Sequence, residues 1–149
     1  MSNLSVKLQR TASATLAVGN VTADATRPRR LKLYDALFSQ AEATPADGNT
    51  RFEVQRCTTA GTGTAVTPRL LDPADPATEA DALENHTIDP TLTAGEISLT
   101  FGLNQRSTMR WVAAPGSEIV VPAVASNGLA VRTPVAALVA TAVLLFLAE

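Results

Sequence analysis

Cysteine and histidine are almost absent from this chain of 149 residues, which contains one of each, Cys57 and His86. One cysteine cannot close a disulfide within the chain. Zinc centres built from clusters of cysteine and histidine need more ligands than these two residues supply, and most hydrolytic sites need a histidine with partners close to it. We therefore expect no disulfide, no bound metal, no cofactor and no enzymatic activity.

The short motifs in the chain also lack the residues that phosphate-binding, calcium-binding or catalytic sites require. The glycine-rich segment 61–64 has neither the lysine that ends a phosphate-binding P-loop nor the third glycine of a dinucleotide fingerprint. The acidic residues between positions 72 and 89 lack the central glycine of an EF-hand calcium loop, although a weak site for a divalent cation stays open. Cys57 could act as a nucleophile only if the fold brought a base such as His86 close to it.

Charged and aromatic residues are also scarce, at 17% and 4% of the sequence. Globular domains usually contain about 25% charged residues, and depletion of charge is typical of surfaces that are buried against a partner. The net charge of −2 argues against general affinity for nucleic acid. Residues 1–70 nevertheless hold nine Lys or Arg, whereas residues 71–100 hold seven acids and no Lys or Arg. This asymmetry either guides contacts with partners or forms a solvated acidic loop.

No hydrophobic run reaches the length of a membrane-spanning helix. The uncharged stretch 133–148 has 16 residues, whereas a spanning helix needs about 20. We therefore prefer a terminal strand over 138–147, covered on both faces, to a tail anchor. The first 18 residues lack the continuous apolar segment of a signal peptide. Together with the single cysteine, this predicts synthesis in a reducing cytoplasm and no membrane partner.

Alternation of apolar and polar residues indicates a β protein. The alternation is clear at 4–10, 50–58, 97–103 and 109–113. Turn residues separate these segments at short intervals, as in a β-sandwich or barrel. The sequence predicts an all-β, single-domain sandwich or barrel with at most one or two short helices. We assign residues 31–149 to this domain and residues 1–30 to an N-terminal arm or edge strands.

Three segments carry less regular signals. Residues 31–40 begin with strand alternation and continue with apolar residues at helical spacing, which predicts a strand that breaks into a helical turn. Residues 77–85 could form a short acidic helix capped by Thr78. Asn127-Gly128 is a strong hairpin signal and predicts that the short strands on either side of it pair with each other.

Three groups of residues are candidates for contact with a partner. The first group lies in residues 1–12, which form either a strand of the domain or an extended arm on a neighbouring copy. The second is a basic cluster, formed by Arg27, Arg29 and Arg30, that could touch another subunit, nucleic acid or only solvent. The third contains a tryptophan that either packs in the core or anchors an interface. The candidate residues are Leu4, Val6, Lys7, Arg10, Arg27, Arg29, Arg30, Arg110 and Trp111.

The segment 110–123 reads Arg-Trp-Val-Ala-Ala-Pro-Gly-Ser-Glu-Ile-Val-Val-Pro-Ala and is followed by Asn127-Gly128. With segments 54–64 and 71–75, it resembles small virion structural proteins of tailed bacteriophages, over roughly residues 50–149. Some of these resemble jelly-roll cement proteins that sit as trimers on the capsid lattice. The resemblance implies a jelly-roll-like fold and a head-decoration protein that binds the major capsid protein across joints between subunits.

The same resemblance implies a homotrimer on the head surface of the virion, made in the bacterial host cytoplasm. A copy at each joint would oppose separation of the capsid subunits, and simultaneous contacts would multiply affinity. An arm such as residues 1–10 could add a strand to a neighbour's edge. The alternative is a tail or head-fibre module that binds a host receptor or glycan. That class favours exposed aromatic residues, and this chain has only six aromatic residues.

Overall fold

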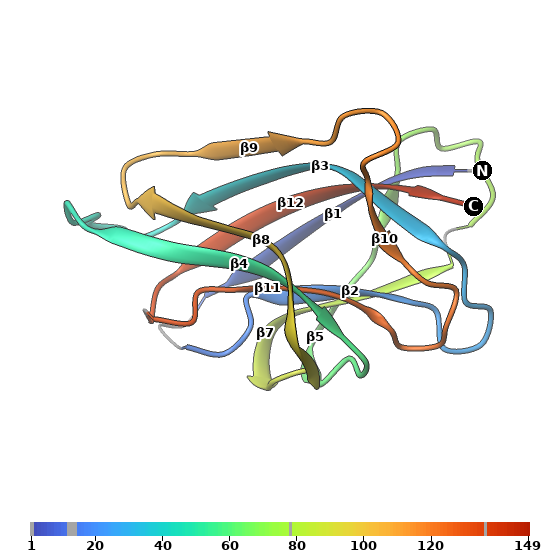
Figure 1. The fold of residues 1–149 in the computed structure, drawn as a ribbon, viewed down its shortest axis with the longest axis horizontal. Coiled ribbons are helices and arrows are strands. Elements are labelled where there is room, and N and C mark those ends of the chain that lie inside the picture. Colours follow the sequence, from blue (N-terminus) through green and yellow to red (C-terminus); the bar gives the residue numbers. More distant parts are fainter. Residues whose placement is uncertain (1, 12–14, 78, 136) are drawn as a thin grey trace.

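The computed structural model describes residues 2–11, 15–77, 79–135 and 137–149, and within these residues the chain forms twelve strands and no helix. Among the described residues there is accordingly no helix long and apolar enough to cross a membrane. The strands build two antiparallel sheets of six that face each other (Figure 1). This confirms the all-β prediction, and of the two architectures left open the protein has the sandwich rather than the closed barrel.

We call the sheet that contains the first and the last strand sheet A. Its central strands are β3 (Leu31–Gln40), β12 (Ala140–Ala148) and β1 (Ser2–Arg10), in that order; β9 (Met109–Val112) and β10 (Ile119–Val121) flank β3, and β6 (Arg69–Leu70) flanks β1. Sheet B has the order β5 (Thr62–Val66), β7 (Ala80–Ile88), β2 (Gly19–Ala23), β11 (Gly128–Arg132), β4 (Asn49–Cys57) and β8 (Leu92–Asn104).

The hydrophobic core fills the space between the sheets. The alternating residues of β1 that were predicted to form a strand, Leu4, Val6 and Leu8, are all buried in it. Burial of each such side chain stabilises the fold by about 1.5–3 kcal/mol. Where β3, β4 and β8 meet, three phenylalanine rings contact one another with centroids 4.9–5.9 Å apart. The apolar face of each sheet is therefore covered by the other sheet.

β3 runs as one strand, so the predicted helical turn is wrong. The register between β3 and β12 shifts by one residue, which leaves Tyr34 as the extra residue of a β-bulge. Leu31 and Leu33 are buried in the core before the bulge, and Ala36 and Phe38 are buried after it. The bulge moves the apolar residues from odd to even positions, and in the sequence this change imitates helical spacing.

The acidic helix predicted for residues 77–85 is also wrong, because residues 80–88 form β7. Its expected cap, Thr78, lies outside the described residues. β7 is hydrogen-bonded between β2 and β5, and Ala80 and Ala82 face the core. Pairing on both sides and burial of one face outweigh the weak helix propensity of this alanine- and glutamate-containing segment.

The hairpin predicted at Asn127-Gly128 is not formed. β10 pairs with β3 in sheet A, whereas β11 lies between β2 and β4 in sheet B, so the chain passes here from one sheet to the other. A Cβ atom at Gly128 would lie 2.2 Å from the carbonyl oxygen of Val21. The glycine is therefore needed for close approach of two strands rather than for a tight turn.

Of the two terminal strands, β1 has one of the two conformations that the sequence left open, and β12 differs from expectation. Residues 2–10 do not extend as an arm, because β1 is bonded to β12 on one side and to β6 on the other within the same chain. Ser2 pairs with Ala148, so the two ends of the chain lie side by side (Figure 1). β12 was expected to be covered on both faces, but alternate residues along it are only half-buried.

Candidate partner-binding face

The outer face of sheet A carries apolar side chains that the fold leaves partly exposed. Along β12 the even-numbered residues are buried in the core, so Val143, Leu145 and Leu147 face outward and are half-buried. Leu37 of β3 lies opposite Val143, and Val112 of β9 lies one strand beyond Leu145 in the same row. Leu37 is 39% exposed and Val112 is 57% exposed. We call these five residues the apolar strip.

Cationic side chains border the apolar strip. Val143 lies between Lys7 of β1 and Leu37 of β3, and Leu37 is itself opposite Arg110 of β9. Arg69 of β6 lies at the edge of the next row. Side chains directly opposite in a sheet have Cβ atoms about 4.5–5.5 Å apart, so these cations are within reach of whatever covers the strip. Lys7, Arg69 and Arg110 are all exposed.

Arg110 forms an ion pair with Asp35 beside the strip. Its Nη2 donates to Oδ2 of Asp35 at 2.5 Å, and its Nε donates to Oδ1 at 3.1 Å. The hydrogen bond from Arg110 lowers the pKa of Asp35, and Asp35 in turn raises the pKa of Arg110. A shallow hollow of about 340 Å³ lies between this pair and Leu37, Val143 and Leu145. Because the two charges neutralise each other, an apolar partner can cover the hollow without burying an unpaired charge.

Of the four candidate residues in β1, only Lys7 is available at the surface. Leu4 and Val6 are buried in the core, and Arg10 is 1% exposed. Arg10 donates to Leu138 O at 2.7 Å, to Leu16 O at 2.5 Å and to Thr133 Oγ1 at 2.5 Å. Burial lowers the pKa of Arg10. Its guanidinium therefore ties together the loops before β2 and β12, and a partner could not reach it in this structure.

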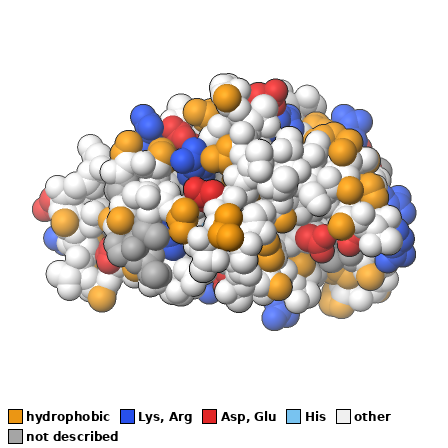
Figure 2. All heavy atoms as spheres, turned by 90° about the horizontal axis from the view of Figure 1, so that it is seen from below, with side chains coloured by type: hydrophobic (Ala, Val, Ile, Leu, Met, Phe, Trp, Pro, Cys, Tyr) orange, Lys and Arg blue, Asp and Glu red, His pale blue; other side chains and the backbone are white. Residues whose placement is uncertain are grey.

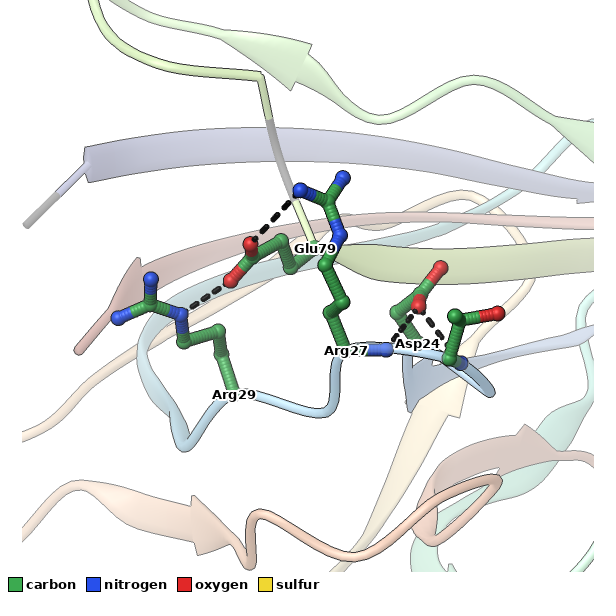
Figure 3. Close-up of polar contacts among 5 residues, drawn as sticks. Asp24, Arg27, Arg29 and Glu79 are labelled. Carbon is green, nitrogen blue, oxygen red and sulfur yellow. Dashed lines mark hydrogen bonds and ion pairs between the residues drawn. The ribbon is translucent and has the colours of Figure 1, made fainter.

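The basic cluster lies on the loop between β2 and β3, with Arg27 and Arg29 both directed toward Glu79 (Figure 3). Asp24 Oδ1 shapes this loop by accepting from the backbone N–H of Thr26 at 2.8 Å and of Arg27 at 2.6 Å. Both Arg27 and Arg29 form ion pairs with Glu79, which precedes β7. The carboxylate of Glu79 therefore compensates part of the positive charge and joins this loop to sheet B.

Arg30, the last member of the basic cluster, is exposed and holds the chain end through its backbone. Its carbonyl oxygen accepts from the N–H of Glu149 at 2.9 Å, and Glu149 forms an ion pair with Lys32 at 2.6 Å. Arg29 also lines a small hollow together with Ser2 and Glu149. The basic cluster thus surrounds the end of the sandwich where the two chain ends meet, and it does not join Arg110 in one site.

Arg110 and Trp111 are neighbours in sequence but belong to opposite faces of β9. Arg110 lies on the outer face with the strip, whereas Trp111 is half-buried and packs against the core. Because Trp111 is only half-buried, part of its side chain stays exposed to solvent. The structure therefore separates the two candidates: Arg110 is part of the outer face and Trp111 belongs mainly to the core.

Cys57 and His86 both lie close to Ala60, but they do not form a reactive pair. The Ala60 carbonyl oxygen is 3.1 Å from His86 Nε2 and accepts from Asn20 Nδ2 at 3.0 Å. Burial raises the pKa of the Cys57 thiol to about 11 and lowers the pKa of His86. The thiol is thus protonated at neutral pH and hidden from solvent. Among the described residues, no three His, Cys, Asp or Glu side chains are grouped to hold a metal ion.

All five residues of the apolar strip were missed by sequence reasoning. The alternating pattern of β12 is hidden in the sequence because both of its faces are apolar, and such runs are usually buried on both sides. From the side of β5 and β7, the surface instead shows hydrophobic, basic and acidic side chains interspersed (Figure 2). Only the register of sheet A could reveal that one apolar face of β12 is open.

No protein-family model matches the chain, and neither a curated protein nor a solved structure matches it.

Proposed function

We propose that this protein is a virion structural subunit that decorates and stabilises the head of a tailed phage by binding the major capsid protein. The observation that carries the proposal is the apolar strip on the outer face of sheet A, with its border of Lys7, Arg69 and Arg110. A partly exposed apolar centre with a charged border is the usual anatomy of a protein-binding surface. The resemblance of residues 50–149 to small virion proteins supplies the class of partner.

The sandwich suits a decorating role because it is a rigid body. Both sheets share one core, and the described ends of the chain are paired inside sheet A rather than free. A rigid subunit that lies across a joint between two capsid subunits opposes their separation. Each contact can be weak, because several copies bound to one lattice act together. Some of the proteins that this chain resembles are similar to cement proteins that sit as trimers, and a homotrimer on the head surface remains part of the proposal.

The alternative function is receptor or glycan binding by a tail or head-fibre module. Glycan sites favour exposed aromatic rings, but here Phe38, Phe52 and Phe146 are buried and the other three aromatic side chains are half-buried. The apolar strip is aliphatic throughout. These observations favour a protein surface over a sugar as the ligand, and they place the decoration hypothesis first.

Co-sedimentation with phage heads that lack the protein tests this proposal. We expect the purified wild-type chain to pellet with the heads and Leu145→Glu to lose binding by about tenfold or more, because a charge in the strip would be buried without a partner. Ile88→Glu is the matched control: Ile88 is 62% exposed on β7, outside the strip, so this variant should bind as the wild type does.

Two results would contradict the proposal in different ways. If the wild-type chain stays in the supernatant at every concentration, the capsid is not the partner, and a glycan array then tests the alternative. If Leu145→Glu pellets as well as the wild type, the capsid contact lies elsewhere than the apolar strip. Circular dichroism of both variants should match the wild type, because both side chains are partly exposed before substitution.

A further inference from the structure

The five edge strands of the sandwich differ greatly in length. β6, β10, β9 and β5 have two, three, four and five residues. β8 has thirteen residues and pairs only with β4. An edge strand presents unpaired N–H and C=O groups to any other strand, and natural proteins usually protect edges by keeping them short, charged or interrupted by proline. β8 is therefore the edge most suited to accept another strand.

The second half of β8 lacks two of the usual protections, charge and proline, although the register of β8 with β4 is irregular before Leu99. Residues 97–104 read Ile-Ser-Leu-Thr-Phe-Gly-Leu-Asn and contain no charged residue and no proline. Ile97 is 42% exposed, and Leu99 and Phe101 are half-buried against the core. The ring of Phe101 lies 4.9 Å from that of Phe38, centroid to centroid. The open side of the sandwich thus ends in apolar side chains that are incompletely covered.

The backbone groups of β8 that point outward can be identified. Gln105 N–H donates to Gly48 O at 3.1 Å, which makes Asn104 and Asn49 a non-hydrogen-bonded pair of the ladder. Because such pairs alternate with hydrogen-bonded ones, the N–H and C=O groups of Thr100 and Gly102 point away from β4. The register is uninterrupted between residues 99 and 104, and both residues are exposed. They are the free hydrogen-bonding positions of this edge.

We propose that two copies of this protein pair through β8, antiparallel about a two-fold axis near Phe101, so that their B sheets join into one continuous sheet. In such a contact Phe101 meets its own copy and its neighbours meet residues of the same short segment, so a charge near the axis would lie close to its own copy. Residues 97–104 carry no charge. Thr100 and Gly102 of each copy supply the backbone groups that bond the other.

The charges that flank this segment are complementary under the same axis. Glu96 and Arg106 lie at equal distances from Phe101 along the sequence and carry opposite charges, so the two-fold axis brings Glu96 of each copy toward Arg106 of the other. Within one copy Glu96 pairs with Arg56 at 3.2 Å and Arg106 pairs with Asp47 at 2.7 Å, but the side chains of Glu96 and Arg106 remain 53% and 59% exposed and so can be reached by the second copy. A partner of different sequence would not share this symmetry, and for that reason we assign the edge to a second copy. The inference does not depend on the proposed function.

Light scattering after size exclusion of the full chain, with a concentration series, tests the inference. We expect the free wild-type chain in solution to have twice its 15.5 kDa monomer mass, with the trimer of the proposed function forming only on the head surface. Gly102→Pro should raise the dimer dissociation constant by roughly tenfold to a hundredfold, because it removes one outward N–H from each copy. This N–H makes no bond to β4, and a Cβ at Gly102 meets nothing within 4 Å, so the fold tolerates the change. Gly102→Ala keeps the N–H and should remain a dimer.

The remaining outcomes are equally decisive. A wild-type monomer at the highest soluble concentration would overturn the inference, and so would a dimer that Gly102→Pro does not weaken. A mass three times that of the monomer, unchanged by Gly102→Pro, would refute two-fold pairing through β8 while leaving the capsid proposal intact. If Gly102→Pro fails to fold, Thr100→Lys replaces it, because lysine is tolerated at sheet edges and would place like charges together in the dimer.

Discussion

The outer faces of the two sheets differ in the polarity and in the exposure of their side chains. On sheet A the outward side chains of β12 are mostly apolar, and they remain half-exposed. On sheet B the outward side chains of β2 and β4 are polar and yet buried: Asn20 is 0% exposed, and Glu53 and Gln55 are each 6% exposed. The polarity of an outward residue therefore does not decide its exposure in this protein.

Hydrogen bonds to backbone carbonyl groups explain how polar side chains are buried on the outer face of sheet B. Asn20 Nδ2 donates to Ala60 O at 3.0 Å, and Gln55 Nε2 donates to Thr93 O at 2.8 Å. Each bond satisfies a buried polar side chain. The first also holds the loop that contains Ala60 against the sheet, whereas Thr93 belongs to the neighbouring strand β8. Val143 and Leu145 on sheet A cannot form such bonds. The apolar strip therefore lies open, because none of its five side chains can form a hydrogen bond that would hold a loop over it.

The largest expected effect on stability is the difference between substitutions on the inner and on the outer face of β12. Leu144 is fully buried and Leu145 is half-buried, so Leu144→Ala should lower the free energy of unfolding by about 2–5 kcal/mol through loss of contacts and the cavity that remains. Leu145→Ala should lower it by less than about 1 kcal/mol. Urea unfolding of both variants measures the contrast. Equal losses would mean that the outer face of β12 is covered as well as its inner face.

A smaller loss of stability is expected when a hydrogen bond between sheet B and the loop that contains Ala60 is removed. Asn20→Ala removes the hydrogen bond to Ala60 and should cost about 1–2 kcal/mol of unfolding free energy. It should also speed labelling of the Cys57 thiol, which is buried beside Asn20, by a thiol reagent under native conditions. Thr64→Ala, on the exposed part of β5, is the control for both measurements. Unchanged stability and labelling in Asn20→Ala would show that this bond does not hold the loop.

The smallest effect concerns the ion pair beside the apolar strip. Arg110 lowers the pKa of Asp35, so the pair stabilises the folded state above the unfolded-state pKa of about 4, and this contribution is lost as the pH falls through the lowered pKa of Asp35. Asp35→Asn should therefore be slightly less stable than the wild type near pH 7 and approach it in acid. Urea unfolding midpoints measured from neutral to acid pH check this. A stability difference that grows as the pH falls has the wrong sign for this account.

Strand content was readable from the sequence wherever one face of a strand is apolar and the other polar. β1, with Leu4, Val6 and Leu8, and β4, with Phe52 and Val54, have this pattern, because each of them buries one face in the core. The alternation did not predict a strand correctly where apolar residues changed from odd to even positions, or where both faces of a strand were apolar. The bulge at Tyr34 moved the buried apolar residues of β3 from odd to even positions. In β12 both faces are apolar, so the sequence did not show which face is buried.

The candidate site was only partly predictable, for a related reason. Lys7 and Arg110 were selected as single residues, and the structure places them in one row across β1, β12, β3 and β9. Arg10 was selected for its charge, yet three hydrogen bonds to neighbouring loops hold it inside the protein. A charged residue suggests a surface position only when the fold provides no polar groups to receive it.

The sequence by itself determined the all-β class, the positions of most strands and the scarcity of residues suited to catalysis or metal binding. These properties depend on local alternation and on composition, which need no knowledge of neighbours. The tertiary structure alone decided which sheet each strand joins, as β10 and β11 illustrate, and which faces and edges stay open. Strand pairing brings together residues that are far apart in the chain, so the apolar strip and the free edge of β8 exist only once the register is set.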